Sequence, residues 1–149
     1  MKKLLSIIIT LAIWVPLHAQ NKPVGWNFSY KKVSANTYNV YLSAMVSEPW
    51  HIYSETTPAG GPIPTKITFS GNPLLKMTGQ ITEQGELKVV HDKNFGVDVK
   101  YFKRNVSFVQ TIKVISKAKT SLHGTIEYMV CNDNKCLPPE TIPFDIIMN

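Results

Sequence analysis

The amino-acid sequence predicts an all-β protein made of short antiparallel strands. Several segments alternate apolar and polar residues with a period of two, which is typical of strands that bury one face. Turn-forming residues separate these segments at roughly even spacing, and the chain contains 10 prolines and 8 glycines. No window has a convincing helical period. Many short strands favour a sandwich or a barrel, and polar outer faces suit two packed antiparallel sheets, so we expect an immunoglobulin-like β-sandwich.

The clearest strand lies at 38–46, where every second residue is apolar and shares one face: Tyr38, Val40, Leu42, Ala44 and Val46. The same period predicts shorter or less regular strands at 65–69, 97–101, 106–114 with one slip at Val109, 125–130 and 142–146. Residues that interrupt the alternation predict turns at 34–36, 58–62, 71–73 and 117–120.

The N-terminus has the layout of a secretory signal peptide. Two lysines precede an apolar run over 4–15, and the small residue Ala19 follows it. Because the run is too short to span a bilayer comfortably, an uncleaved anchor is the weaker alternative. We expect cleavage after Ala19, with Gln20 as the second choice. This gives a signal peptide of residues 1–19 and one mature domain of residues 21–149.

The charge of the chain does not indicate a nucleic-acid partner. The formal net charge is +6, and removal of residues 1–20 lowers it to +4 because two lysines and no acidic residue are lost. The remaining basic residues are scattered along the sequence. A mild excess of this kind affects solubility and lacks the clustering that nucleic-acid binding requires.

The two cysteines lie in the segment VCNDNKCLPPE, residues 130–140. Cys131 ends an expected strand, and Cys136 comes shortly before the next alternating run. Residues 132–135 are therefore expected to form the loop of a hairpin whose two arms each end in a thiol. Cross-strand neighbours have Cα atoms about 4.5–5.5 Å apart, which is close to the separation that a disulfide requires.

Spacing alone leaves a structural disulfide and a redox couple both open. Closing a loop of about six residues contributes only about 2 kcal/mol in the chain-entropy model, and a domain of this size should not depend on it. Short, exposed disulfides are also the more reducible ones. A zinc site is disfavoured because no histidine stands at matching spacing, and C-x-x-C-H for c-type haem is absent. A cysteine hydrolase would need a base, for which the sequence offers His51, His91 and His123 without further support. No cofactor or metal is expected.

Three stretches in a consistent order carry a resemblance to a known family. Residues 128–141 (YMVCNDNKCLPPET) resemble its redox hairpin, residues 48–53 (EPWHIY) its aromatic strand, and residues 90–96 (VHDKNFG) its cap loop. The family is that of the N-terminal periplasmic domain of the thiol:disulfide interchange protein DsbD. The resemblance extends from about Trp26 to Ile146. It implies an immunoglobulin-like sandwich, in agreement with the strand pattern.

The resemblance also implies a reductant relay. In the family, a membrane-embedded domain and then a thioredoxin-like domain pass electrons to this sandwich, which reduces periplasmic proteins. By motif position, Cys136 would form the mixed disulfide with partners and Cys131 would resolve it. The resemblance implies further site residues in the cap loop and the aromatic strand: Phe95 as the cap over the disulfide, Asp92, Trp50 and Tyr53. From the residues alone, an anchor in a minor core is the favoured role of Phe95, and Trp50 and Tyr53 are equally packing residues.

The expected partners are thioredoxin-like proteins and a DsbD-type membrane electron donor, with a periplasmic disulfide isomerase or a cytochrome c maturation protein as acceptor.

The sequence departs from the better-known pattern in two places. Four residues separate the cysteines where the enterobacterial domain has five, and Lys93 and Asn94 replace acidic residues before Phe95. Lys93 or Lys135 would favour the thiolate form of a cysteine. The alternative function is a binding or structural sandwich with a permanent hairpin disulfide. Whether the chain is an enzyme or a stoichiometric carrier is left open.

Overall fold

A computed structural model describes residues 22–93, 95–116 and 119–148 of the chain. These residues form the strands β1 (Val24–Ser34), β2 (Thr37–Val46), β3 (His51–Tyr53), β4 (Lys66–Phe69), β5 (Leu75–Gly85), β6 (Lys88–Asp92), β7 (Val97–Phe102), β8 (Asn105–Val114), β9 (Thr120–Tyr128), β10 (Val130–Cys131) and β11 (Glu140–Met148). In these ranges no helix is long and apolar enough to cross a membrane. The predicted signal peptide, residues 1–19, lies outside the described residues.

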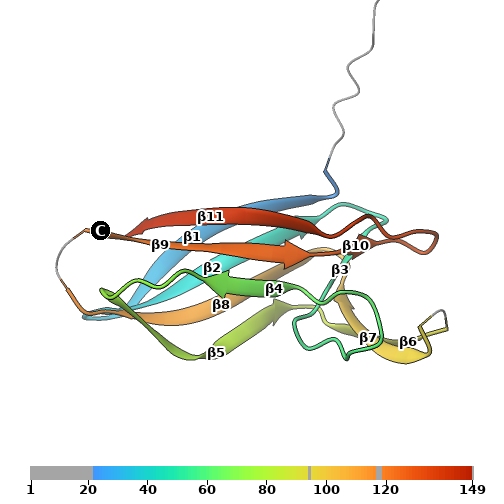
Figure 1. Ribbon diagram of the computed structural model, residues 1–149, viewed down its shortest axis with the longest axis horizontal. Helices are drawn as coiled ribbons and strands as arrows, with labels where there is room; N and C mark the ends of the chain where they lie inside the picture. The colour runs from blue at the N-terminus through green and yellow to red at the C-terminus, as the bar shows by residue number, and fades with distance from the viewer. Residues whose placement is uncertain (1–21, 94, 117–118, 149) are drawn as a thin grey trace, which may run out of the picture.

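The described strands form three antiparallel sheets. Two of them, in the orders β1-β2-β8-β5 and β11-β9-β4, are the layers of a sandwich. The third has the order β10-β3-β7-β6, and Figure 1 shows it at the end of the molecule away from the C-terminus. The predicted all-β antiparallel sandwich is confirmed, and the small third sheet carries both β10 with its cysteine and the aromatic strand β3.

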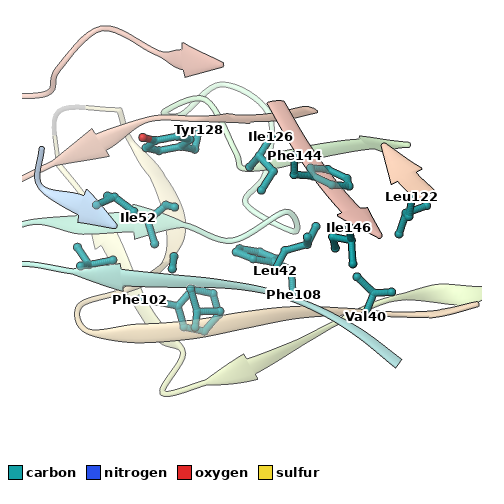
Figure 2. Packing of buried hydrophobic residues seen from close by; sticks show 14 of the residues in the cluster. Val40, Leu42, Ile52, Phe102, Phe108, Leu122, Ile126, Tyr128, Phe144 and Ile146 are labelled. Carbon is teal, nitrogen blue, oxygen red and sulfur yellow. The ribbon is translucent and has the colours of Figure 1, made fainter. Parts of the chain in front are cut away.

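The main core lies between the two layers of the sandwich. Its side chains come from alternate positions of β2, β8, β9 and β11, and Figure 2 shows them pointing toward one another: Val40, Leu42, Phe108, Leu122, Ile126, Phe144 and Ile146. Each of them is at most 6% exposed. The alternation along β2 is the one that the sequence predicts, because a strand with one buried face places every second side chain in the core.

The predicted slip at Val109 coincides with an irregularity in the sheet. Val109 and Gln110 are both buried, and the pairing of β5 with β8 shifts register between Thr78 and Thr82. The Gln110 side-chain amide donates hydrogen bonds to the carbonyl oxygens of Thr78 at 3.0 Å and Gly79 at 3.5 Å. Gly79 has a φ of 71°, in the left-handed region that favours glycine. The bulge in β5 is therefore closed by a buried polar side chain from β8.

The strand predicted over 125–130 is divided in the structure. β9 ends at Tyr128 and pairs with β11 and β4, whereas β10 begins at Val130 and pairs with β3. The alternation continues across Met129, so the period of two does not reveal that the chain leaves one sheet for another. This change of partner carries Cys131 out of the sandwich and into the small sheet. Three further strands were not predicted: β1, β5 and β6.

Candidate functional site

The two cysteines form a disulfide across the mouth of the predicted hairpin. Cys131 and Cys136 are antiparallel bridge partners, and their Cα atoms are 4.0 Å apart. Asn132 builds the turn between them: its side-chain oxygen accepts hydrogen bonds from the backbone N–H groups of Asn134 and Lys135, both at 2.9 Å. Its own N–H donates to the Lys135 carbonyl at 2.9 Å. An asparagine that satisfies three backbone groups in this way lets a loop of four residues close the bridge.

The two cysteine residues have different environments. Cys131 is 2% exposed and packs in a small cluster with Tyr53 and Val99, apart from the main core. Cys136 is exposed. Leu137, the next residue, donates its N–H to the Val130 carbonyl at 2.9 Å, so the hairpin remains paired on the far side of the disulfide. An external thiol can therefore approach Cys136, while Cys131 is covered by protein.

The strand β3 supplies two buried side chains beside Cys131. His51 is the register partner of Cys131, and Tyr53 follows two residues later on the same face. The His51 Nε2 atom and the Tyr53 hydroxyl are 3.1 Å apart. The Tyr53 carbonyl accepts a hydrogen bond from the Thr65 hydroxyl at 2.5 Å, which fixes the end of the strand. Both rings are thus held in place by packing and by hydrogen bonds.

The pKa values of these two residues are shifted in ways that keep them neutral. Burial lowers the pKa of His51 below its ordinary value of 6.5, and the positive charge of Lys103 lowers it further, while Asp133 and Asp92 oppose the shift. Burial raises the pKa of Tyr53 to about 12, with Asp92 and Tyr101 contributing in the same direction. At pH 7 the site therefore contains a neutral imidazole and a protonated phenol beside a buried sulfur.

The cap loop forms a tight turn at the rim of the site. Asp92 accepts two hydrogen bonds, from the Gly96 N–H to its carbonyl at 2.7 Å and from the Phe95 N–H to its side chain at 3.4 Å. Gly96 has a φ of 68°, which glycine adopts without strain. Phe95 is 41% exposed, so it is not an anchor in a buried minor core. It lines a surface hollow together with both cysteines.

This hollow, called the cysteine hollow below, collects most of the residues that the sequence singled out. Its walls come from β3, β6, β7, the cap loop and the hairpin, and they include Cys131, Cys136, Phe95, Asp92, Tyr53, Lys93 and Lys135. Asn94 lies outside the described residues. Among the described residues, no three side chains of His, Cys, Asp or Glu gather as a metal site.

Trp50 lies on the other side of the hairpin. It does not line the cysteine hollow among the described residues but borders two neighbouring grooves, one of them shared with Leu137 and Pro138. The Lys135 ammonium lies 5.9 Å from the centre of its ring, which is within the range of a cation–π contact. Trp50 also packs against the main core. Trp50 therefore contacts the hairpin from outside the cysteine hollow.

Sequence reasoning did not place His51 beside the cysteines. It appeared only as one of three histidines available to a hydrolase. The signal that identifies it is the strand register, because β3 pairs with β10 so that His51 lies directly opposite Cys131. Register between two short strands that are separated by about eighty residues cannot be read from alternation.

Comparisons with known proteins agree with this geometry. The fold and the hairpin define the class of protein as an immunoglobulin-like antiparallel β-sandwich with a disulfide at one end. A model of the family described as "Thiol:disulfide interchange protein DsbD, N-terminal" matches residues 20–146, and the chain belongs to this family. A search by sequence among curated proteins gives no match.

Solved structures show the same fold at low sequence identity. The N-terminal periplasmic domain of ScsB from Proteus mirabilis is 14% identical with a TM-score of 0.61; the similarity covers 86% of this chain and 47% of that one, so this chain spans about half of its length. The DsbD N-terminal domain of Neisseria meningitidis in the reduced form is 16% identical with a TM-score of 0.52, covering 82% and 85% of the two chains. The complex between the DsbD and PilB N-terminal domains of Neisseria meningitidis gives 16% identity and a TM-score of 0.52, covering 91% of each.

Proposed function

We propose that the chain exchanges thiols and disulfides through Cys131 and Cys136 and passes reducing equivalents to partner proteins. The observation that carries this proposal is the unequal exposure of the two cysteine residues, with Cys136 exposed and Cys131 only 2% exposed. Thiol–disulfide exchange needs one sulfur that a partner can reach and a second that releases the partner. Membership of the DsbD N-terminal family supports the same chemistry.

The exchange has two halves. In the first, a donor thiolate attacks Cys136 Sγ; the Cys131–Cys136 bond breaks, and Cys131 leaves as a thiolate that takes up a proton. A second donor thiolate then attacks the donor's own sulfur in the mixed disulfide, which releases Cys136 and oxidises the donor. In the second half, the Cys136 thiolate attacks an acceptor disulfide, and Cys131 attacks Cys136 to release the reduced acceptor. Two electrons pass from the donor to the acceptor in each cycle.

The partners that we propose are proteins with exposed dithiols or disulfides. A thioredoxin-like protein or a DsbD-type membrane electron donor would reduce the hairpin, and a periplasmic disulfide isomerase or a cytochrome c maturation protein would oxidise it. A solved complex of a related domain with the PilB N-terminal domain supports the idea of a protein partner. The location that we propose is the periplasm, where the predicted signal peptide would direct the chain and where disulfides persist.

A redox titration tests the proposal. The protein is equilibrated with mixtures of reduced and oxidised glutathione, and the fraction of free thiol is measured by alkylation. We expect a reduction potential above about −300 mV, in the range of exchangeable disulfides, whereas a lower value would mark a permanent structural bond and support the alternative function.

Trapping with single-cysteine variants identifies the sulfur that meets partners. In Cys131→Ser, the exposed Cys136 should form a stable mixed disulfide with a disulfide-bearing partner protein, because the resolving thiol is absent. In the matched variant Cys136→Ser, the remaining thiol is buried and trapping should be much weaker. Equal trapping by both variants would contradict the assigned order of attack.

A further inference from the structure

His51 is placed to act on Cys131. The two residues are antiparallel register partners on β3 and β10, and such partners project to the same face of a sheet with Cβ atoms about 4.5–5.5 Å apart. Both are buried, with His51 8% and Cys131 2% exposed, and both line the cysteine hollow. An imidazole and a thiol of opposed strands can therefore meet inside the protein.

One ring nitrogen of His51 lacks a partner in the oxidised structure. Within the described residues, Nδ1 is a buried polar atom with no hydrogen bond, while Nε2 is 3.1 Å from the Tyr53 hydroxyl. Buried polar atoms are nearly always paired, so an orphan calls for an explanation. The sulfur of Cys131 is held in the disulfide and carries no proton in this state. Reduction gives it an S–H group, a hydrogen-bond donor on the residue that lies opposite His51 in the strand pairing.

We propose that His51 exchanges a proton with Cys131, accepting it when Cys131 attacks and returning it when Cys131 leaves. This inference rests on the proposed function and adds a named proton acceptor to it. The Tyr53 hydroxyl fixes the ring by its contact with Nε2, and so acts as a positioning residue.

The electrostatic surroundings suit a base that is neutral at pH 7. Tyr101 belongs to β7 and Lys103 follows the last residue of that strand; the Tyr101 and His51 ring centres are 4.4 Å apart. Asp133 belongs to the hairpin, Asp92 to the cap loop, and Tyr53 to β3 itself. Burial and Lys103 lower the pKa of His51, and the two aspartates oppose them. A neutral imidazole can accept a proton, and the nearby carboxylates support the imidazolium that forms.

In the resolving step, one disulfide bond replaces another and the proton of Cys131 passes to His51. The Cys131 Sγ proton moves to His51 Nδ1, and the resulting thiolate attacks Cys136 Sγ. The Cys131–Cys136 bond forms, the bond between Cys136 and the partner breaks, and the partner's sulfur leaves as a thiolate. The imidazolium then gives its proton to that thiolate or to water in the cysteine hollow. In the reverse direction the same ring protonates the departing Cys131.

An assay with a small aromatic disulfide as the substrate measures the attack by Cys136 and the resolution by Cys131 separately. The full chain is first reduced with a phosphine, because this reduction does not depend on the reduction potential of the two cysteines. It is then mixed with dithiobis(nitrobenzoate). The first thionitrobenzoate released reports the attack by Cys136, and the second reports the resolution by Cys131. At pH 7 we expect His51→Phe to slow the second release on the order of tenfold or more, because an unassisted thiol with a pKa of about 8.5 is only about 3% thiolate.

The pH profile distinguishes proton transfer from loss of packing. In the natural chain the second release should be nearly level above pH 7, whereas in His51→Phe it should rise about tenfold per pH unit up to the thiol pKa. The first release should change by less than about twofold. The control variant His123→Phe removes an exposed histidine that is 3.3 Å from Asp145 on the sandwich, and both releases should be unchanged. A second release with the same rate and profile in His51→Phe would overturn the proposal.

A measurement on the natural chain covers the case in which His51→Phe does not fold. Nitrogen NMR of the histidine rings, compared between the oxidised and reduced states at pH 7, should show a change at His51 Nδ1 and none at His123. An unchanged Nδ1 signal would overturn the proposal. Failure of the proposed function is distinguishable, because it would appear as a couple that glutathione cannot reduce, while the phosphine-reduced chain still reports on His51.

Discussion

At the scale of single residues, the site is defined by the solvent exposure of its side chains. Cys136 is exposed, Cys131 is 2% exposed, and Phe95 is 41% exposed at the rim of the hollow that contains both sulfur atoms. A large aromatic side chain that remains partly in water forgoes part of the hydrophobic stabilisation that full burial would give. We propose that the ring limits the access of small thiols to the disulfide, because it lines the same hollow as both cysteines.

Removal of the Phe95 ring should expose the disulfide to small reductants. We expect Phe95→Ala to speed reduction by dithiothreitol about fivefold, equivalent to about 1 kcal/mol of activation free energy, because the ring no longer covers part of the hollow. The rate is measured from the appearance of free thiols under pseudo-first-order conditions. Val89→Ala is the matched control, since Val89 is a 58% exposed apolar residue of the neighbouring strand outside the hollow. Equal acceleration by both variants would contradict a shielding role for Phe95.

At the scale of strands, Gly124 is a point on which two strand pairings depend. It pairs with Phe69 of β4 on one side and with Phe144 of β11 on the other. A Cβ at this position would lie 2.3 Å from the Thr68 carbonyl oxygen and 2.4 Å from Phe144 Cζ. The Phe144 ring occupies that space and packs against Phe28 of the opposite layer, with ring centres 5.7 Å apart. The glycine thus lets one aromatic ring connect the two sheets.

The variant Gly124→Ala should destabilise the sandwich. Because one contacting atom belongs to the backbone of β4 and cannot turn away, we expect the free energy of unfolding to fall by about 2–3 kcal/mol. Urea denaturation measures the change. In the control Gly71→Ala the added Cβ meets nothing within 4 Å, so stability should change by less than about 0.5 kcal/mol. Similar denaturation midpoints for both variants would show that the sheet adapts to the added methyl group.

Strands were predictable from the sequence where one face is buried and the other is not. β2 meets this condition and was predicted nearly to its ends. β6 does not, because four of its five residues are exposed, and its sequence has no alternation to detect. β5 contains a bulge that breaks the period. β1 could have been found, since Trp26, Phe28 and Tyr30 alternate along it and pack against the core.

The cysteine pair was predictable from its spacing, whereas the other predicted residues of the candidate site came from the family resemblance. The cysteines and the cap loop are local motifs, so their spacing and order identified them. His51 depends on the pairing of two short strands that are far apart in the sequence, and Trp50 depends on which side of the hairpin it faces. Both are properties of the assembled sheets, which a single sequence without structure does not determine.

At the scale of the whole molecule, the carboxylate of Glu83 joins the small sheet to the sandwich. Glu83 of β5 accepts hydrogen bonds from the Ser54 hydroxyl at 2.6 Å and from the Glu55 backbone N–H at 2.7 Å, just beyond the end of β3. The strand that carries His51 and Tyr53 is therefore tied to the main sheet by one carboxylate. Burial raises the pKa of the neighbouring Glu55 to about 7, and the charge of Glu83 raises it in the same direction.

The raised pKa of Glu55 predicts a fold that loses stability as the pH rises. The folded protein holds the proton of this carboxyl up to about pH 7, whereas the unfolded chain releases it near pH 4.5. The unfolded state therefore binds fewer protons between these values, and the free energy of unfolding falls across that window. Because Glu55 is partly exposed to solvent, we expect a loss of about 1–2 kcal/mol, well below the full linkage value.

In Glu55→Gln this loss should disappear, so that the variant is the more stable protein at pH 8 and close to the natural chain at pH 4. Urea denaturation at both pH values measures the difference, with Glu48→Gln as the control at an exposed carboxylate. If the natural chain and Glu55→Gln changed stability in parallel between pH 4 and pH 8, the proton held by the Glu55 carboxyl would have no part in the stability of the fold.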